Sequence, residues 1–230
     1  VGSEMCIRDR FTAMVGLLVA PVTVSFTTAS LSLLAVAIGS GAAGALNMWY
    51  ESDVDALMSR TCLRPIPTGK IKRDQALLFG IILSFISIVM LYLSSNLISA
   101  LLLAATISFY FFIYTIWLKR KTAQNIVIGG AAGALPPVIG WAVAMNNISL
   151  EPIIMFLIIF IWTPSHFWAL SLYKFKDYEK AKIPMLPITA GIEKTKLNIL
   201  VYAFLMLPVV IAPFFIGFGS VIYLVLSLGM

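Results

Sequence analysis

Residues 76–118 read ALLFGIILSFISIVMLYLSSNLISALLLAATISFYFFIYTIWL, a long stretch without one charged side chain. Polar residues near its middle divide it into two apolar segments, 76–93 and 97–118. Each segment is near the roughly 20 residues that a helix needs to cross a bilayer. The apolar residues do not alternate with polar ones, and the segments are too long for the strands of a membrane barrel. This stretch therefore predicts two transmembrane α-helices.

The rest of the chain continues the pattern, because apolar segments recur from end to end. Hydrophobic residues make up 60% of the chain and charged residues only 11%, which excludes a soluble domain. The sequence predicts an all-α, polytopic transmembrane bundle. The further segments are expected near 11–20 (too short alone), 26–46, 125–144, 151–173, 197–217 and 218–230.

The positive charges follow the predicted spans. Beyond residue 10, every Lys and Arg lies in 47–75, 119–121 or 174–196, whereas the intervening connections carry none. Basic loops on alternate connections are typical of the cytoplasmic side of a membrane protein. The net charge of +6 therefore indicates orientation in a cell membrane, and no nucleic-acid partner is expected. The lipid bilayer is the expected surrounding.

The two ends of the chain differ from the rest. Residues 1–10, VGSEMCIRDR, are polar and charged, and we expect this segment to be non-native. The membrane domain is expected over residues 11–230. The last apolar segment is cut off at Met230, so the domain is expected to be incomplete at both ends.

The sequence between the first two long spans is dense in charge. Asn47, Glu51 and Asp55 are spaced i, i+4 and i+8, which places them on one face of a helix, with Asp53 off that face. Mg²⁺ prefers one or two carboxylates together with phosphate oxygens. The guanidiniums of Arg60 and Arg64 suit the diphosphate that such a metal would hold. The alternative is a solvated loop whose charges only set topology.

A second unusual segment runs from Lys119 through Asn125 to the pair Pro136-Pro137. A proline pair inside a span removes helical hydrogen bonds and interrupts the helix. Neighbouring groups must then satisfy the freed carbonyls, which favours a helix that lines a cavity. A simple packing kink is equally compatible with the sequence.

The third segment surrounds His166, the only histidine of the chain. An ionisable group inside a span is costly and therefore points to function, although a lone histidine is often structural. Trp162 and Trp168 flank it and could instead belong to an aromatic belt at the membrane interface. Lys174 and Asp177 follow on the predicted cytoplasmic side, where a clamp on a diphosphate would need them.

Together these segments resemble the UbiA-type intramembrane prenyltransferases, and within them the branch that farnesylates haem. The resemblance spans residues 11–230. It rests on Asn47-x-x-x-Glu51-x-Asp53-x-Asp55, Arg60-Thr61, Arg64-Pro65, residues 124–130 with Pro136-Pro137, the string WTPSHFW at 162–168, and Asp177-Tyr178 with IPMLP at 183–187. Family members often have Asp at the position of Glu51 and Pro at that of Ser165. The second acidic motif has only Asp177, which leaves a second metal site open.

The resemblance implies a nine-helix fold, of which this chain would supply about seven or eight, and a specific reaction. A farnesyl group would pass from farnesyl diphosphate to a vinyl group of haem b, with Mg²⁺ as cofactor. The catalytic residues would be Glu51, Asp55 and Asp177, and the metal ligands Asn47, Glu51, Asp55 and Asp177. The diphosphate would be bound by Arg60, Arg64, Lys119 and Lys174, and the haem and prenyl cavity would be lined by Asn125, Trp162, His166 and Trp168.

Two other functions compete with this interpretation. A prenyltransferase acting on an aromatic acid, a quinone precursor, should show a fuller second aspartate motif than the chain has. A membrane transporter would place its ionisable groups near the middle of the bilayer. Here the acids and arginines lie at one edge, which favours an enzyme.

Overall fold

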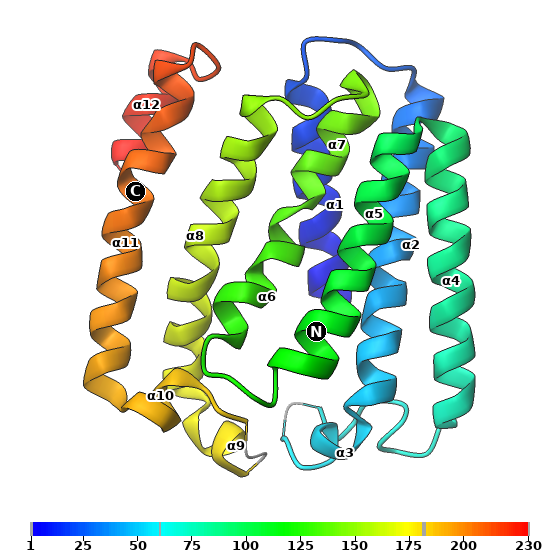
Figure 1. Cartoon of the computed structure of the whole chain (residues 1–230), viewed down its shortest axis with the longest axis vertical. Coiled ribbons are helices and arrows are strands. Elements are labelled where there is room, and N and C mark those ends of the chain that lie inside the picture. The colour runs from blue at the N-terminus through cyan, green and yellow to red at the C-terminus, as the bar shows by residue number, and fades with distance from the viewer. Residues whose placement is uncertain (1, 60, 181–182, 230) are drawn as a thin grey trace.

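Helices make up most of the residues that the computed structural model of the protein describes, which are 2–59, 61–180 and 183–229. No strand occurs among these residues, so the predicted all-α bundle is confirmed (Figure 1). The helices are α1 (Gly2–Val19), α2 (Phe26–Tyr50), α3 (Ser52–Asp55), α4 (Arg73–Ser94), α5 (Leu97–Ser108), the π-helix η1 (Phe109–Leu118), α6 (Asn125–Ala134), α7 (Pro136–Met145), α8 (Leu150–Tyr173), α9 (Phe175–Lys180), α10 (Leu186–Ala190), α11 (Ile192–Phe215) and α12 (Val221–Leu228).

Six helical segments of the described chain are long and apolar enough to cross a membrane. They are Phe26–Tyr50, Arg73–Ser94, Leu97–Leu118, Asn125–Met145, Leu150–Tyr173 and Ile192–Phe215. Each corresponds to one predicted span. The predicted spans at 11–20 and 218–230 are also helical, as parts of α1 and α12, but neither meets the same criterion.

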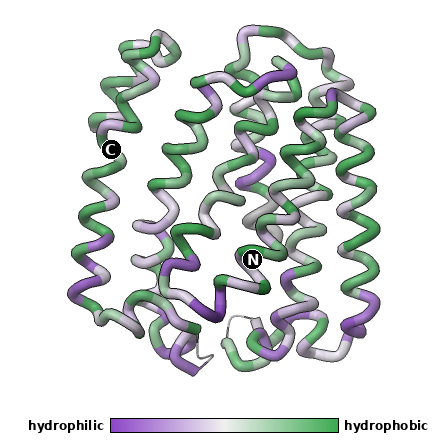
Figure 2. The backbone as a smooth tube through the Cα atoms, in the orientation of Figure 1, coloured by the Kyte–Doolittle hydropathy of each residue, from purple (hydrophilic) through white to green (hydrophobic). Residues whose placement is uncertain are grey.

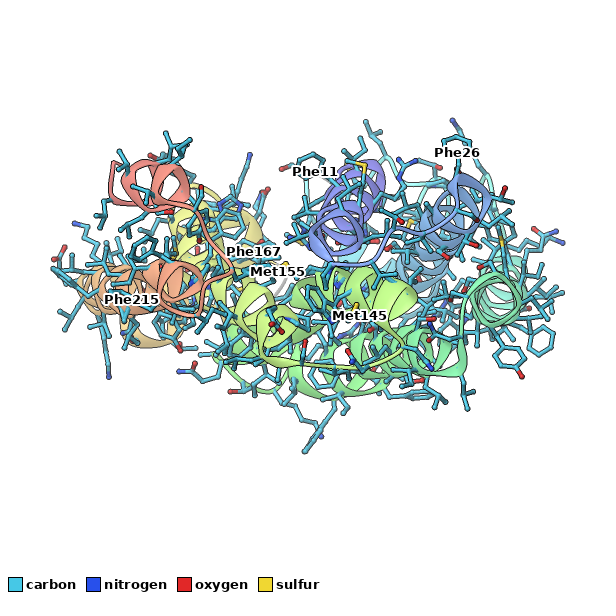
Figure 3. The ribbon with its side chains drawn as sticks, turned by 90° about the horizontal axis from the view of Figure 1, so that it is seen from above. Phe11, Phe26, Met145, Met155, Phe167 and Phe215 are labelled. Atoms are coloured by element: carbon cyan, nitrogen blue, oxygen red, sulfur yellow. The ribbon has the colours of Figure 1, made fainter. Side chains whose placement is uncertain are left out.

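The helices form one bundle with α4 at one edge and α11 with α12 at the other, as Figure 1 and the perpendicular view of Figure 3 both show. Only Thr195 and Pro213 of α11 are buried, and its leucines and phenylalanines face outward. Figure 2 shows hydrophobic helices with hydrophilic residues gathered in the loops at the lower end. Such outer surfaces suit lipid, which is as apolar as the side chains that meet it.

Proline and glycine shape the centre of the bundle. The helix is interrupted at one residue, Leu135, between α6 and α7, although the Leu135 backbone keeps right-handed helical dihedral angles. The first turn of a helix tolerates proline because its N–H groups need no helical partner there. Glycines then let α1 approach α7, since a Cβ on Gly16 would lie 2.0 Å from the Pro137 carbonyl oxygen and one on Gly140 1.9 Å from that of Ala13.

The three basic loops lie together at the lower end of the bundle in Figure 1, as their alternation along the chain predicts. Arg120, after η1, donates to both carboxylate oxygens of Asp53, over 2.8 and 3.0 Å. Ser59, after α3, donates to Asp177 of α9 over 2.6 Å. Segments that are far apart in the sequence thus surround one opening.

Candidate active site

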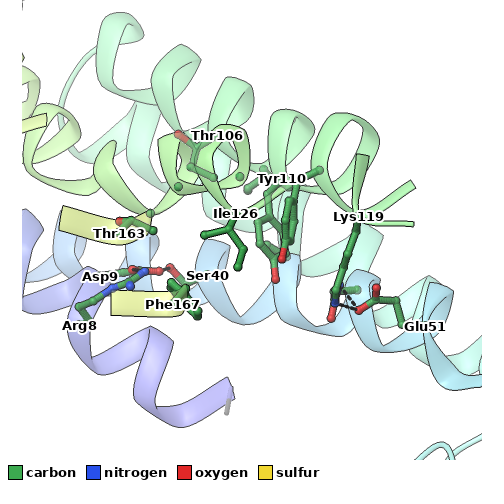
Figure 4. A pocket seen from close by; sticks show the side chains of 18 of the residues that line it. Arg8, Asp9, Ser40, Glu51, Thr106, Tyr110, Lys119, Ile126, Thr163 and Phe167 are labelled. Carbon is green, nitrogen blue, oxygen red and sulfur yellow. Dashed lines mark hydrogen bonds and ion pairs between the residues drawn. The ribbon is translucent and has the colours of Figure 1, made fainter. Parts of the chain in front are cut away.

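A cavity of about 380 Å³ lies inside the bundle above these loops. Helices α2, η1, α6 and α8 form its sides. At its lower end the described loops and α9 contribute Met58, Thr61, Arg64, Tyr178, Ile183 and Met185. Figure 4 shows Glu51 and Lys119 at one end, Tyr110 and Ile126 along one wall, and Thr163 toward the other end. The end with Glu51 and Lys119 is therefore charged, and the walls beyond it are mostly apolar and aromatic as far as Arg8 and Asp9 at the opposite end.

The charged end begins with the predicted acidic face. Helix α2 ends at Tyr50 and α3 begins at Ser52, but Glu51 carries the helical register across the joint. Its N–H donates to the Asn47 carbonyl over 2.9 Å, and the N–H of Asp55 donates to the Glu51 carbonyl over 2.8 Å. All three predicted side chains consequently line the cavity, and the two carboxylates are only 2% and 3% exposed.

Each buried carboxylate is paired with a cation. The ammonium of Lys119, the first residue after η1, contacts Oε2 of Glu51. The guanidinium of Arg64 donates to Oδ2 of Asp55 over 2.6 Å. Leaving a buried charge unpaired is strongly unfavourable, so these pairs account for acids lying inside a membrane protein. Lys119 and Arg64 both line the cavity, as predicted for residues that would meet a diphosphate.

The donor set at this end fits Mg²⁺. Oε1 of Glu51 is buried and has no hydrogen-bond partner among the residues that the structure describes. The amide nitrogen of Asn47 donates to Glu51 over 2.8 Å and to Thr115 over 3.2 Å, which leaves the amide oxygen as the only possible metal ligand of that side chain. Within the described ranges, no three His, Cys, Asp or Glu side chains form a metal site. Two carboxylates and an amide are what Mg²⁺ commonly takes alongside phosphate oxygens.

An aromatic wall, which the sequence analysis did not identify, follows on η1. Tyr110 and Tyr114 line the cavity with ring centroids 5.3 Å apart, and the Lys119 ammonium lies 5.8 Å from the Tyr114 ring. Within this π-helix the side-chain hydroxyl of Thr115 donates to the Tyr110 carbonyl over 2.9 Å. Helical turns of this kind are frequent at functional sites. Gly129 of α6 leaves room for Tyr114, because a Cβ there would lie 2.3 Å from its ring.

The opposite wall comes from α8. Trp162 and His166 are one helical turn apart, and their rings stack with centroids 4.4 Å apart and planes 15° apart. Phe167 meets the His166 ring edge-on at 5.4 Å, and all three residues line the cavity. The predicted placement of Trp162 and His166 beside one cavity therefore agrees with the structure.

Several predicted site residues lie elsewhere. Trp168 is fully buried in the core, where its ring meets Tyr202 of α11 edge-on at 5.3 Å, and it does not line the cavity. It lies two positions after His166, a rotation of about 200° around a helix, which turns it to the other face. Asn125 is buried behind the cavity, and its amide donates to the Lys119 carbonyl over 3.0 Å.

The remaining predicted residues lie at the lower rim. Asp177 accepts its hydrogen bond from Ser59, and Lys174 is exposed just after α8; neither lines the cavity. Helix α8 ends at Tyr173, and the turn into α9 takes both side chains away from the acidic pair. Arg60 lies outside the described residues.

Asp53 occupies the outside of the same joint. Its carboxylate is 60% exposed, and hydrogen bonds from Arg120 hold its pKa below the ordinary value. The Arg120 guanidinium also lies 5.2 Å from the Tyr50 ring, within the range of a cation–π contact. Asp53 thus connects two loops and does not line the cavity.

Arg8 and Asp9 of α1 also reach the cavity, at the end away from Glu51 (Figure 4). Asp9 accepts a hydrogen bond from Ser40 over 2.8 Å. Both residues fall in the segment predicted to be non-native, so we assign no function to them.

Comparison with known proteins agrees with this geometry. The model of the UbiA prenyltransferase family matches residues 11–230. The chain belongs to the UbiA prenyltransferase family. Family membership makes the chain a prenyltransferase and sets the transporter alternative aside. The match begins after residues 1–10, whose non-native origin stays a prediction.

Individual UbiA relatives include two curated proteins that share the name protoheme IX farnesyltransferase. The one from Pelagibacter ubique is 68% identical over 218 residues, covering 95% of this chain and 72% of the relative. The one from Ehrlichia ruminantium is 57% identical over 202 residues, covering 88% and 68%. These identities place the chain beside farnesyltransferases of haem within the family.

Solved UbiA structures share the fold at low sequence identity. A digeranylgeranylglyceryl phosphate synthase aligns with a TM-score of 0.80 at 19% identity, covering 97% of this chain and 78% of that one. A UbiA homologue from Archaeoglobus fulgidus, bound to GPP and Mg²⁺, aligns with a TM-score of 0.79 at 18% identity, covering 98% and 79%. At this identity the likeness concerns the fold alone.

Proposed function

We propose that this chain transfers a farnesyl group from farnesyl diphosphate to a vinyl group of haem b, which gives haem O. The observation that carries the proposal is one elongated cavity with two carboxylate–cation pairs at one end and aromatic walls beyond them. Such a cavity suits an amphiphile with an anionic head and an apolar tail. The high identity to proteins named protoheme IX farnesyltransferase supports haem as the acceptor.

The bond changes balance as follows. The C–O bond between the farnesyl group and the diphosphate breaks, and the diphosphate leaves with the electron pair. The farnesyl carbon bonds to the terminal carbon of the vinyl group, which leaves a positive charge on the carbon next to the haem ring. A water molecule adds to that carbon and gives up a proton, so a hydroxyl group remains there.

The charged end of the cavity would stabilise the leaving group. Arg64 and Lys119 would donate to the diphosphate oxygens, where negative charge grows as the C–O bond breaks. Asn47, Glu51 and Asp55 would hold Mg²⁺, which supplies further positive charge beside the same oxygens when it is bound. The predicted contributions of Arg60, Lys174 and Asp177 remain proposals, with the last two acting from the rim.

The aromatic walls would protect and direct the farnesyl group. Tyr110 stands between the charged end and the rest of the cavity, where an allylic cation would form (Figure 4), and the Tyr114 ring lies 5.3 Å from it. Aromatic faces attract cations, and an apolar cavity keeps water away until the new bond exists. The stacked Trp162 and His166 offer a flat surface and one polar nitrogen to haem. The basic loops support an opening of this site toward the cytoplasmic surface of the cell membrane, because such loops are typical of that side.

The direct test is conversion by the complete protein in lipid nanodiscs, supplied with haem b, farnesyl diphosphate and Mg²⁺. Mass spectrometry of the pigments should show haem O, in an amount that grows with time and disappears without farnesyl diphosphate. An aromatic acid offered in place of haem b should give no prenylated product. A prenylated aromatic acid with unchanged haem b would overturn the assignment of the acceptor.

A further inference from the structure

The cations that the diphosphate needs are bound to the carboxylates that the metal needs. Lys119 contacts Glu51, and Arg64 donates to Asp55 over 2.6 Å, all four side chains lining one cavity. The two acids and the two bases together carry no net charge. A ligand of either sign that enters this end of the cavity must therefore disturb both pairs.

Charge balance decides which ligands can enter. Inside a membrane protein the dielectric constant is low, so an uncompensated charge costs far more than it does in water. A divalent cation alone would face Lys119 and Arg64, which repel it. A diphosphate alone would face Glu51 and Asp55. A divalent cation and a diphosphate that enter together carry opposite charges of similar size, and every charge can then find a partner.

The local structure permits an exchange of partners. The backbone carbonyl of Lys119 is held by Asn125 over 3.0 Å, and that of Arg64 accepts from the N–H and the hydroxyl of Thr68, over 3.1 and 2.9 Å. The two backbones are fixed while the charged groups sit at the ends of long side chains. Glu51 already has one buried oxygen that no described residue bonds.

We infer that Lys119 and Arg64 are exchangeable counterions that make metal and diphosphate bind together. Each base leaves its carboxylate for a diphosphate oxygen, and the metal takes the carboxylate that is released. The inference rests on the proposed function in so far as the two ligands share this end of the cavity. By thermodynamic linkage, the factor by which diphosphate raises metal affinity equals the factor by which metal raises diphosphate affinity.

The test measures binding of radiolabelled manganese and of radiolabelled inorganic pyrophosphate to the complete protein, immobilised in nanodiscs. The scintillation proximity assay detects only the ligand bound to the immobilised protein. In each titration the bound ligand is plotted against the concentration of free ligand. In the unchanged protein each ligand should raise the affinity of the other by about tenfold, a typical coupling between two sites. In Lys119→Met the metal alone should bind about fivefold more tightly or better, and the coupling should fall below about twofold.

Lys121→Met is the matched control, because it removes a positive charge from an exposed position of the same loop outside the cavity. It should behave as the unchanged protein, and Arg64→Met should behave as Lys119→Met does. Independent binding of the two ligands to the unchanged protein, or full coupling in both cavity variants, would overturn the inference. If the protein converts haem but the two ligands bind independently, the inference is wrong and the proposed function stands. If the two ligands raise each other's affinity but haem is not converted, only the proposed acceptor is wrong.

Discussion

Asp53 and Asp55 are the same residue type, two positions apart, yet they lie in opposite environments. Asp55 is 3% exposed, lines the cavity and meets Arg64, whereas the Asp53 side chain is 60% exposed and meets Arg120 outside. The helical register that Glu51 carries across the joint of α2 and α3 separates them. Here the position of a carboxylate around the helix, more than its residue type, decides whether it lines the cavity or only connects loops outside it.

The largest expected effect is on turnover, from replacing the inner carboxylate. Asp55→Asn removes charge from the end of the cavity proposed to bind the leaving group, and losing one such stabilising group typically costs about 3–4 kcal/mol, or 10²–10³-fold in rate. The rate of haem O formation, measured by mass spectrometry in nanodiscs, should fall accordingly.

Asp53→Asn is the matched control, because it makes the same chemical change outside the cavity. Its rate should stay within about fivefold of the unchanged protein, since exposed pairs are worth about 0.2–1 kcal/mol. Equal losses of rate in Asp55→Asn and Asp53→Asn would mean that lining the cavity does not matter for catalysis.

A smaller effect is expected from crowding the aromatic wall. Gly129→Ala places a Cβ 2.3 Å from the Tyr114 ring, which must shift into the cavity, and overpacking of this kind costs about 1–3 kcal/mol. The melting temperature and the turnover should both decrease. Gly41→Ala should lower neither, because no described atom lies within 4 Å of a Cβ there. A normal rate and melting temperature in Gly129→Ala would argue against Tyr114 as a fixed wall.

The two ends of the cavity should respond differently to loss of His166. His166→Ala removes a ring that stacks on Trp162, and aromatic contacts of this kind are worth about 0.5–1.5 kcal/mol. Haem affinity, followed by absorbance titration, should fall by about two- to tenfold while pyrophosphate binding is unchanged. Loss of pyrophosphate binding with normal haem binding would reverse the assignment of the two ends.

The smallest expected effect is on the stability of the fold, through the pH dependence of the ion pair between Asp53 and Arg120. Because the hydrogen bonds from Arg120 lower the pKa of Asp53 in the folded protein, the pair stabilises the fold above the unfolded pKa, about 4. That contribution is lost as pH falls through the folded pKa, and it amounts to less than about 1 kcal/mol. The melting temperature of Asp53→Asn should therefore lie slightly below that of the unchanged protein at neutral pH. The two should converge in acid, and a gap that widened there would contradict the pairing.

Apolar length and helical spacing made most of the fold predictable. The six long spans follow from runs of apolar residues, and the break at Pro136 follows from the missing N–H of proline. The acidic face followed from i, i+4 spacing, which survives the joint at Glu51. The separation of Trp168 from His166 could have been derived from the same geometry, because two residues turn a helix by about 200°.

The parts that could not be predicted depend on irregular backbone. Tyr110 and Tyr114 belong to a segment so rich in aromatic residues that no single face stands out, and the π-helical register of η1 changes which residues turn inward. The positions of Lys174 and Asp177 depend on the turn between α8 and α9, which sequence spacing does not determine. Pairing of the buried acids with Lys119 and Arg64 joins segments that only the folded chain brings together.

The close contact between α1 and α7 has a consequence for how the protein is made. Gly16 and Gly140 leave no space between these helices for a side chain or a lipid tail. Yet α1 leaves the ribosome long before α7 is synthesised, and α2, α4 and α5 are inserted in between. The surface of α7 that contacts α1 therefore does not exist when α1 is synthesised. Assembly must include a later docking step, in which α1 packs against α7.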